Sequence, residues 1–385
     1  MTDPRHGFST RAVHADGLPR LAGEVAPALH LSTTFARGSD GALEGAHLYA
    51  RLSNPNRDAV ERTLVALEGG ANAALAFASG LAAADALLSA LRPGGGGVQG
   101  ARVVVEQGAY YGVMRQFHAL AAAGVEVVSA DLTDSRAARA ALTQPLHLVW
   151  CETPTNPLLG IADIALVASL AHAQGAALVV DNTIATPLLQ SPLLLGADAV
   201  LHAATKALGG HSDLTMGVLL FADARHPLHI AAAAQRDLTG AAPSPFDCWL
   251  LQRGLATAAL RVRAQEANAR AVAEYLCGHA AVLEVIWPGL AAHAAAGIVA
   301  QQMRGGGSLV SVRLRGGDEG AARFMAALQL FTRATSFGGV HSLAEHRWRV
   351  EGAQSRTPHD LVRLALGIED PADLLRDLAH ALSAC

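Results

Sequence analysis

The chain has 385 residues, of which 51% are hydrophobic, and a formal net charge of −4 with histidine neutral. This length suits two domains, and the weak negative charge indicates neither a nucleic acid nor a membrane surface as a partner. The N-terminus lacks the apolar stretch of a signal peptide, and no apolar run is long enough to span a membrane. The four cysteines form no CxxC pair. We therefore expect a cytoplasmic protein without a disulfide framework or a metal site.

The first fifty residues are rich in turn residues and predict an extended arm. From about residue 54, helical patterns alternate with short apolar runs. Helices are expected near 57–68, 80–91, 111–123 and 163–174. Strands are expected at 102–105, 125–129, 146–151, 177–180, 199–202 and 218–221. Continuous apolar strands between helices predict an α/β fold with a mostly parallel sheet sandwiched by helices.

The pattern changes near residue 245. We expect a long helix over 247–277, then strands at 283–286 and 308–314, a helix near 318–329, a strand at 361–366 and a helix from 371. This order predicts a smaller C-terminal α+β domain. The predicted divisions are an arm at 1–50, an α/β domain at 51–245 and an α+β domain at 246–385.

Lys206 is the only lysine among the 29 Lys and Arg residues. A bias toward arginine explains why other lysines are absent but not why this one remains. Arginine can replace lysine in most salt bridges, whereas only a lysine amine loses its proton readily when desolvated and then attacks a carbonyl. Lys206 follows an apolar run, so it would lie at the carboxyl edge of the sheet, where ligands bind. An ordinary surface lysine is the alternative.

Four other features match what pyridoxal 5′-phosphate (PLP) needs near an imine-forming lysine. Asp181 ends an apolar run and could keep a pyridine nitrogen protonated, and Ser79–Leu81 open a helix whose amides suit a phosphate. Tyr110 offers an aromatic face, and Arg363 offers paired donors for a carboxylate. Each of these features also has an ordinary explanation. Asp181 could be a helix cap, Ser79–Leu81 a common helix start, Tyr110 a packed aromatic, and Arg363 a charge that faces solvent.

Six segments resemble, in their order along the chain, the PLP-dependent enzymes of Cys/Met metabolism. They are Tyr49–Pro55, Glu152–Pro157, Val180–Thr183, Ala204–Lys206, Gly338–Gly339 and Leu361–Glu369. The family includes cystathionine γ-synthase, cystathionine γ-lyase, cystathionine β-lyase and methionine γ-lyase. The resemblance covers nearly the whole chain and implies the PLP-dependent transferase fold type I.

The resemblance also implies residue roles. Lys206 would form a Schiff base with PLP and transfer protons, Asp181 would pair with the pyridinium, and Tyr110 would stack on the ring and assist the leaving group. The implied cofactor-binding residues further include Tyr49, Arg51, Ser79, Gly80, Leu81, Asn156 and Thr205. The implied substrate-binding residues are Arg115, Glu152, Asn156, Thr335, Ser336 and Arg363. Tyr49 and Arg51 would reach a neighbouring subunit's site, which implies a homotetramer built as a dimer of dimers.

Three departures from the family pattern stand out. Ala203 occupies a position where the family often has a phosphate-binding serine, and Asn56 replaces a usual threonine. The segment between Gly339 and Arg363 is shorter than in typical members. It contains a cationic cluster that could touch substrate, although we expect it on a subunit surface: His341, His346, Arg347, Trp348 and Arg349.

The reaction subtype depends on two features. Thr335 occupies a position that is acidic in γ-synthases and γ-lyases, aromatic in β-lyases and small aliphatic in methionine γ-lyases, so it fits none of them. Residues 240–249 look most like γ-lyases. We therefore expect α,γ-elimination of L-cystathionine, a sulfur-containing amino acid, to cysteine, 2-oxobutyrate and ammonia. The alternatives are γ-replacement on an acyl-homoserine, β-cleavage of cystathionine, and a PLP-binding homologue without activity.

Overall fold

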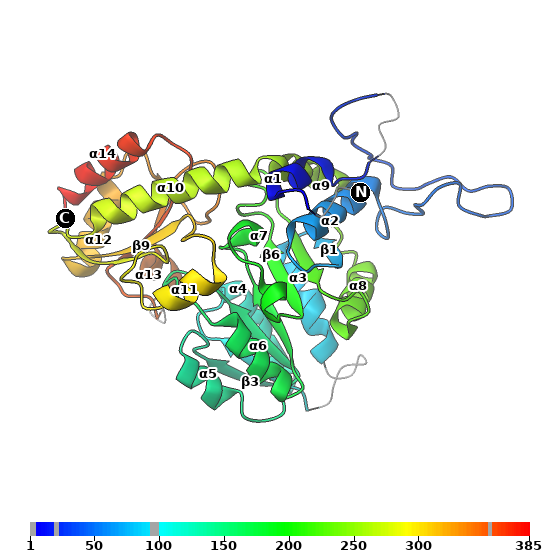
Figure 1. Ribbon diagram of the computed structural model, residues 1–385, viewed down its shortest axis with the longest axis horizontal. Coiled ribbons are helices and arrows are strands. Elements are labelled where there is room, and N and C mark those ends of the chain that lie inside the picture. The colour runs from blue at the N-terminus through cyan, green and yellow to red at the C-terminus, as the bar shows by residue number, and fades with distance from the viewer. Residues whose placement is uncertain (1–4, 19–22, 93–99, 353–355) are drawn as a thin grey trace.

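The computed structural model describes residues 5–18, 23–92, 100–352 and 356–385. A seven-stranded sheet forms the larger part of the molecule, and a five-stranded sheet forms a second, smaller domain. Helix α10 (Ala258–Leu276) runs from the smaller sheet to the helices beside the larger one (Figure 1). None of the described helices is both long and apolar enough to cross a membrane.

The larger sheet has the strand order β1-β7-β6-β5-β4-β2-β3. Its strands are β1 (Ala73–Phe77), β2 (Arg102–Glu106), β3 (Glu126–Ala130), β4 (Leu148–Glu152), β5 (Ala177–Asp181), β6 (Ala199–Ala203) and β7 (Gly217–Phe221). Only β7 runs antiparallel to its neighbours. The predicted mostly parallel sheet is therefore confirmed. Strand β1 was not predicted, because periodicity does not distinguish a short alanine-rich run from a buried helix.

Two apolar cores cover the faces of this sheet, because successive side chains of a buried strand point to opposite sides. Val180 and Val200 belong to one core, and Val179 and Leu201 to the other. The helices α2 (Pro55–Leu67), α3 (Gly80–Leu88), α4 (Tyr111–Ala122) and α6 (Ile164–Ala173) match the predicted ones. Those not predicted include α5 (Ser135–Ala141), α7 (Thr186–Leu189) and α8 (Pro227–Thr239). The predicted α/β class is thus confirmed.

The smaller sheet has the order β10-β11-β12-β9-β8. Its strands are β8 (Val282–Ile286), β9 (Leu309–Leu314), β10 (Thr332–Arg333), β11 (Leu343–His346) and β12 (Leu361–Ala365). The helices of this half are α11 (Ala296–Gln302), α12 (Gly317–Ala327), α13 (Arg347–Glu351) and α14 (Pro371–Leu382). The helix expected over 247–277 is instead two helices, α9 (Pro245–Ala256) and α10, which meet at Thr257. The residue bounds predicted for the domains stay a prediction.

Among the described residues before α2, the one helix is α1 (Phe8–His14), and loops within residues 23–53 project from the body (Figure 1). Asn54 and Asn56, at the start of α2, hold the base of these loops. The Asn56 amide accepts from the His30 N–H at 2.8 Å and donates to the Ala28 carbonyl at 2.8 Å. The Asn54 amide donates to the His30 carbonyl at 3.0 Å. The unusual Asn56 therefore anchors the arm through both ends of its amide.

Candidate functional site

Polar side chains gather at the carboxyl edge of the larger sheet. Glu152 and Asp181 end the parallel neighbours β4 and β5 and lie opposite each other in register. Lys206 follows β6 by three residues, in a turn whose Lys206 N–H donates to the Ala203 carbonyl at 3.0 Å. Because the carboxyl ends of parallel strands meet at one edge, these three residues lie at the edge where such sheets bind ligands.

The Lys206 amine contacts a loop of the smaller domain. Its Nζ donates to the Ser336 Oγ at 2.7 Å and lies 5.2 Å from the centre of the Phe337 ring. Burial lowers the pKa of Lys206, nearby Arg363 lowers it further, and Glu345 opposes the shift. A lysine whose pKa is lowered has more of its amine in the neutral, nucleophilic form. The Lys206 side chain is thus partly buried and hydrogen-bonded, unlike a fully solvated surface lysine.

Arg363, on β12, is only 2% exposed, so it does not face solvent. Its Nη1 donates to the Asn156 Oδ1 at 3.0 Å, and its Nη2 donates to the Ser336 carbonyl at 2.9 Å. Nη2 also donates to the Glu345 Oε2 at 2.6 Å. Burial lowers the pKa of Arg363 to about 10, although Glu345 opposes this. Arg363, Asn156, Ser336 and Lys206 thus form one connected chain of contacts.

Glu345, on β11, is a member of this site that the sequence did not reveal. Its Oε2 also accepts from the Arg347 Nη1 at 3.0 Å, so one carboxylate oxygen serves two arginines. Glu345 lies directly opposite Arg363 in the sheet register. Because β11 was not predicted, this pairing could not be read from the chain.

The expectation that residues 341–349 lie on a surface is wrong in part. His341 and Arg349 are exposed, but His346 is 6% and Arg347 7% exposed. Arg347 also lines a cavity of about 860 Å³ together with Tyr110, Arg115 and Asn156. The buried carboxylate of Glu345 explains the difference, because it draws the Arg347 guanidinium inward.

Asp181 and Glu152 are two buried carboxyl groups with different partners. The Asp181 Oδ1 accepts from the Thr183 hydroxyl at 2.5 Å and from the Thr183 N–H at 3.0 Å. Burial raises the pKa of Asp181, while these hydrogen bonds and His202 oppose the shift. Burial and the neighbouring Asp181 raise the pKa of Glu152 well above its usual range. Burial therefore penalises a charge on both groups, and the hydrogen bonds from Thr183 favour the charged form of Asp181.

Tyr110 precedes α4 and is 37% exposed. Its backbone N–H donates to the Glu152 Oε2 at 2.7 Å, and its ring meets Tyr111 edge to face at 4.6 Å. Burial, followed by the effect of Tyr111, raises the pKa of Tyr110 to about 12. The hydroxyl therefore stays protonated at neutral pH, while part of the ring remains accessible.

The start of α3 offers a place for an anion. Ser79 caps this helix, with its Oγ accepting from the Ala82 N–H at 3.0 Å. The N–H groups of Gly80 and Leu81 open the helix, where backbone donors have no partner in a preceding turn. The Thr205 hydroxyl donates to the Met216 carbonyl at 3.2 Å and accepts from the Met216 N–H at 3.0 Å. Its proton is therefore already engaged in the turn.

Some predicted site residues lie apart from Lys206 within one chain. Among the described residues, Tyr49 and Arg51 make no hydrogen bond with Lys206, Asp181 or Arg363. The Arg51 Nη1 donates instead to the Asp237 carbonyl at 2.8 Å, and its guanidinium lies 5.8 Å from the Tyr49 ring centre. Thr335 is exposed on the loop before Ser336.

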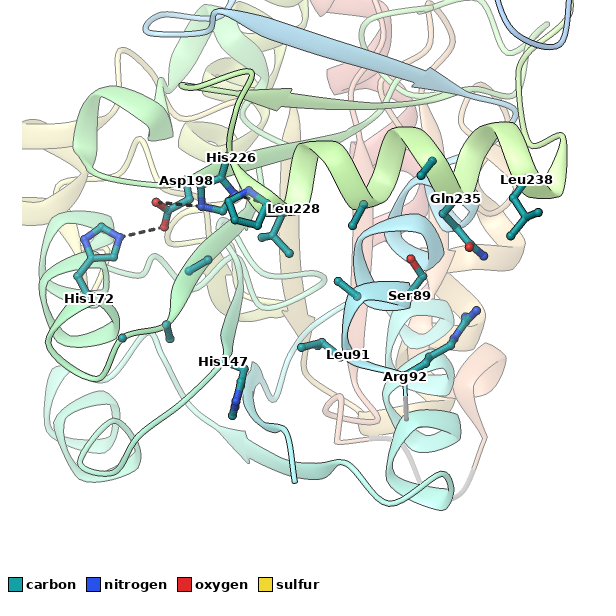
Figure 2. Close-up of a pocket in the computed structure, with 17 residues that line it drawn as sticks. Ser89, Leu91, Arg92, His147, His172, Asp198, His226, Leu228, Gln235 and Leu238 are labelled. Atoms are coloured by element: carbon teal, nitrogen blue, oxygen red, sulfur yellow. Dashed lines mark hydrogen bonds and ion pairs between the residues drawn. The ribbon is translucent and has the colours of Figure 1, made fainter. Parts of the chain in front are cut away.

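A second cavity, of about 960 Å³, lies away from these residues, between α8 and the His172–Asp198 contact (Figure 2). The His172 Nε2 is 2.9 Å from the Asp198 Oδ2, and the His226 Nε2 is 3.9 Å from the other oxygen. None of the predicted site residues lines this cavity. Within the part of the chain that the structure describes, no three His, Cys, Asp or Glu side chains are placed to hold a metal ion.

The partly buried Lys206 amine, the accessible Tyr110 ring and the buried Arg363 guanidinium are groups that could serve a carbonyl cofactor and an amino acid. The chain belongs to the family of Cys/Met metabolism PLP-dependent enzymes, whose model matches residues 9–383. The fold is consistent with PLP-dependent fold type I. PLP is accordingly the cofactor, and sulfur-containing amino acids are the substrates of family members.

Relatives with different reactions resemble this chain over almost their whole length. A cystathionine gamma-synthase of Mycobacterium tuberculosis is 46% identical over 384 residues, which cover 98% of this chain and 97% of that protein. A cystathionine gamma-lyase of Dictyostelium discoideum is 39% identical over 396 residues, covering 100% of both. A crystal structure of cystathionine gamma synthase from Xanthomonas oryzae pv. oryzae in complex with cystathionine has a TM-score of 0.91 at 39% identity, covering 98% of each chain.

The anion site expected at the start of α3, formed by the N–H groups of Gly80 and Leu81, can be tested through Gly217. A Cβ at this position would lie 2.3 Å from the Ser79 carbonyl oxygen and 2.6 Å from the Gly80 Cα. We expect Gly217→Ala to displace this helix start, to cost about 1–3 kcal/mol of stability and to weaken PLP retention severalfold. Dialysis followed by absorbance spectroscopy measures the retention.

Gly297→Ala is the matched control, because a Cβ there meets nothing within 4 Å. Gly297 lies inside a helix, where alanine is the better helix former, so this variant should keep both stability and cofactor. Equal PLP retention in the two variants would contradict a phosphate site at the start of α3.

Proposed function

We propose that this trans-sulfuration enzyme is a carbon–sulfur lyase that converts L-cystathionine and water into cysteine, 2-oxobutyrate and ammonia. The observation that carries the proposal is the continuous contact from the Lys206 amine through Ser336 to the Arg363 guanidinium. This chain of contacts supports the proposal, because Lys206 would accept a proton beside an Arg363 that would bind a carboxylate, and chemistry at the α carbon of an amino acid needs that pairing.

The residues present suit PLP. Lys206 would hold the carbonyl carbon, Asp181 the pyridinium nitrogen, and the N–H groups of Gly80 and Leu81 the phosphate. Tyr110 would cover the ring, and Ser79 would shape the cradle as the helix cap. When bound, PLP supplies an electron sink that stabilises negative charge at the substrate's α carbon. Asp181 suits this role because its hydrogen bonds from Thr183 favour the carboxylate that a pyridinium requires.

The chain's own groups account for binding and proton movement. Arg363, supported by Asn156, would bind the substrate carboxylate, and Thr335 and Arg115 would line the path of the side chain.

Lys206 would take the proton from the α carbon at Nζ, with the Ser336 Oγ orienting that nitrogen from 2.7 Å. The Tyr110 hydroxyl, which burial keeps protonated, would donate a proton to the departing sulfur. Glu152 would remain neutral and hold the Tyr110 backbone in place.

Two observations bear on the choice among reactions. The relatives described above are named for chemistry at the γ carbon, which favours γ- over β-cleavage. The resemblance of residues 240–249 to γ-lyases favours elimination. The 46% identity to a cystathionine gamma-synthase makes γ-replacement on an acyl-homoserine the second candidate.

We also propose that the site is completed by a neighbouring subunit in a homotetramer. Tyr49 and Arg51 come after the loops that project from the body (Figure 1). Among the described residues they make no hydrogen bond with their own chain's Lys206, and Arg51 donates to the Asp237 carbonyl instead. The backbone at these residues is held in place, because the buried Arg57 side chain donates to the carbonyls of Ala50 and Arg51, at 3.2 Å each. A rigid, exposed cation on a projecting segment suits a phosphate in another copy.

Lys206→Ala should abolish turnover and the yellow absorbance of the bound cofactor, because no other side chain can form the imine. In the wild type, borohydride should fix PLP at Lys206, as peptide mass mapping would show. The N-terminal amine is the one other labelling site to control for, and it can be acetylated beforehand. A yellow, active Lys206→Ala enzyme would sink the assignment.

Product analysis distinguishes the candidate reactions. With cystathionine, γ-elimination should yield 2-oxobutyrate, and β-cleavage would yield pyruvate instead. A lactate dehydrogenase assay combined with chromatography of the 2-oxo acids separates the two products. Turnover that requires both an acyl-homoserine and cysteine would identify replacement as the main reaction and overturn the lyase proposal.

Mixing two inactive variants tests the shared site. Lys206→Ala and the double variant Tyr49→Ala/Arg51→Ala should each be inactive, whereas subunits exchanged between them should recover about a quarter of the wild-type activity. The recovery arises because each mixed dimer contains one site with both intact sets of residues. No recovery despite proven exchange, or a monomer by light scattering, would argue against the proposal.

A further inference from the structure

Helix α10 buries a row of polar side chains along one face. Arg261, Gln265 and Asn268 are 5%, 0% and 6% exposed. Their spacing of four and then three residues places them on the same side of the helix. Each donates to backbone carbonyls of loops that lie far away in sequence. This row therefore holds the positions of several loops relative to a single rigid element.

Arg261 holds the loop that carries Lys206. Its Nη1 donates to the Ala207 carbonyl at 2.7 Å, and its Nη2 donates to the Leu208 carbonyl at 3.2 Å and to the Gly254 carbonyl at 2.7 Å. The fit is tight, because a Cβ at Gly210, whose φ is +74°, would lie 1.6 Å from the Arg261 Nη1. The residues that directly follow Lys206 are thus fixed to α10.

Gln265, one turn further along α10, holds the loop that carries Ser336. Its Nε2 donates to the Gly339 carbonyl at 2.7 Å and to the Gly338 carbonyl at 3.3 Å. A Cβ at Gly338 would lie 2.5 Å from the Ala207 backbone nitrogen, so the two loops also touch directly. Both loops are therefore attached to α10 one helical turn apart.

We propose that Gln265 is a positioning residue for the reaction, which keeps the Ser336 hydroxyl against the Lys206 amine. Gln265 contacts neither group and acts through the backbone of residues 338–339. The Ser336 carbonyl also accepts a hydrogen bond from Arg363. The same loop therefore fixes the position of the Lys206 amine relative to the Arg363 guanidinium. The inference rests on the proposed role of Lys206.

Asn268 supplies a matched comparison on the same helix. Its Nδ2 donates to two carbonyls, those of Gly367 at 3.1 Å and Glu369 at 2.8 Å. It is nearly as buried as Gln265 and carries the same amide group, but its two acceptors lie outside the loops of Lys206 and Ser336. Removing either amide leaves two buried carbonyls without that donor, so both changes should lower stability to a similar extent.

The experiment compares Gln265→Met with Asn268→Leu in the full-length chain. Thermal unfolding reports the structural cost of each change. Steady-state kinetics with the holoenzyme reports kcat and kcat/KM for cystathionine. The third measurement uses the single lysine: after removal of PLP, the rate of modification by an amine-specific reagent, followed on the Lys206 peptide against pH, gives the pKa of that amine alone.

We expect Gln265→Met to lower kcat/KM by about 10- to 100-fold, because small displacements of reacting groups have effects of this size. It should also raise the pKa of Lys206 toward its ordinary value. Water that enters the site replaces the Ser336 hydroxyl as the hydrogen-bond acceptor of the amine. Burial is the largest cause of the lowered pKa, so relief of that burial raises the pKa. Asn268→Leu should lose stability but keep the wild-type pKa and kcat/KM.

Equal losses of stability with unchanged pKa and kcat/KM in both variants would show a structural role only and overturn the proposal. Identical shifts in the two variants would do the same, because they would show no preference for the Ser336 loop. If the wild type does not cleave cystathionine, the proposed reaction is wrong, but the pKa comparison still tests the positioning of the amine.

Discussion

The hydrogen bond between the Lys206 Nζ and the Ser336 Oγ joins the two halves of the molecule. Lys206 follows the interior strand β6 of the larger sheet, and Ser336 lies between two strands of the smaller one. The amine is buried where the two domains meet, and burial is the largest cause of its lowered pKa. The environment of the lysine amine therefore includes the smaller domain, through Ser336 and Phe337, as well as the strand that precedes it.

Burial acts on the charged groups of the site in opposite directions. It lowers the pKa of Lys206 and Arg363 and raises that of Asp181 and Glu152. Since desolvation disfavours every charge, each group that stays ionised needs its own partner. Thr183 serves Asp181 in this way, and Glu345 serves Arg363. Glu152 has no cation of its own within hydrogen-bond distance among the described residues, and burial raises its pKa well above the usual range.

The sequence predicted the parts of this site that depend on local order along the chain. Asp181 and Lys206 follow apolar strands, and parallel strands bring their carboxyl ends together whatever the length of the connections. Glu345 and Gln265 were missed because their importance depends on register and on contacts between distant elements. Glu345 acts through its pairing with Arg363 across strands, and Gln265 acts through carbonyls more than seventy residues away. Their side chains carry no motif by which a single sequence could single them out.

The same reasoning explains why the cationic cluster at 341–349 divides. Alternation along a strand sends neighbouring residues to opposite faces, so a run of charges cannot all lie in one environment. Glu345 points toward Arg363, and the strand ends at His346, after which the chain turns and brings Arg347 back onto the same carboxylate. Arg349 then meets Asp318 at the surface, at 2.7 Å. The buried carboxylate of Glu345 thus explains why Arg347 lies at the site while Arg349 lies at the surface.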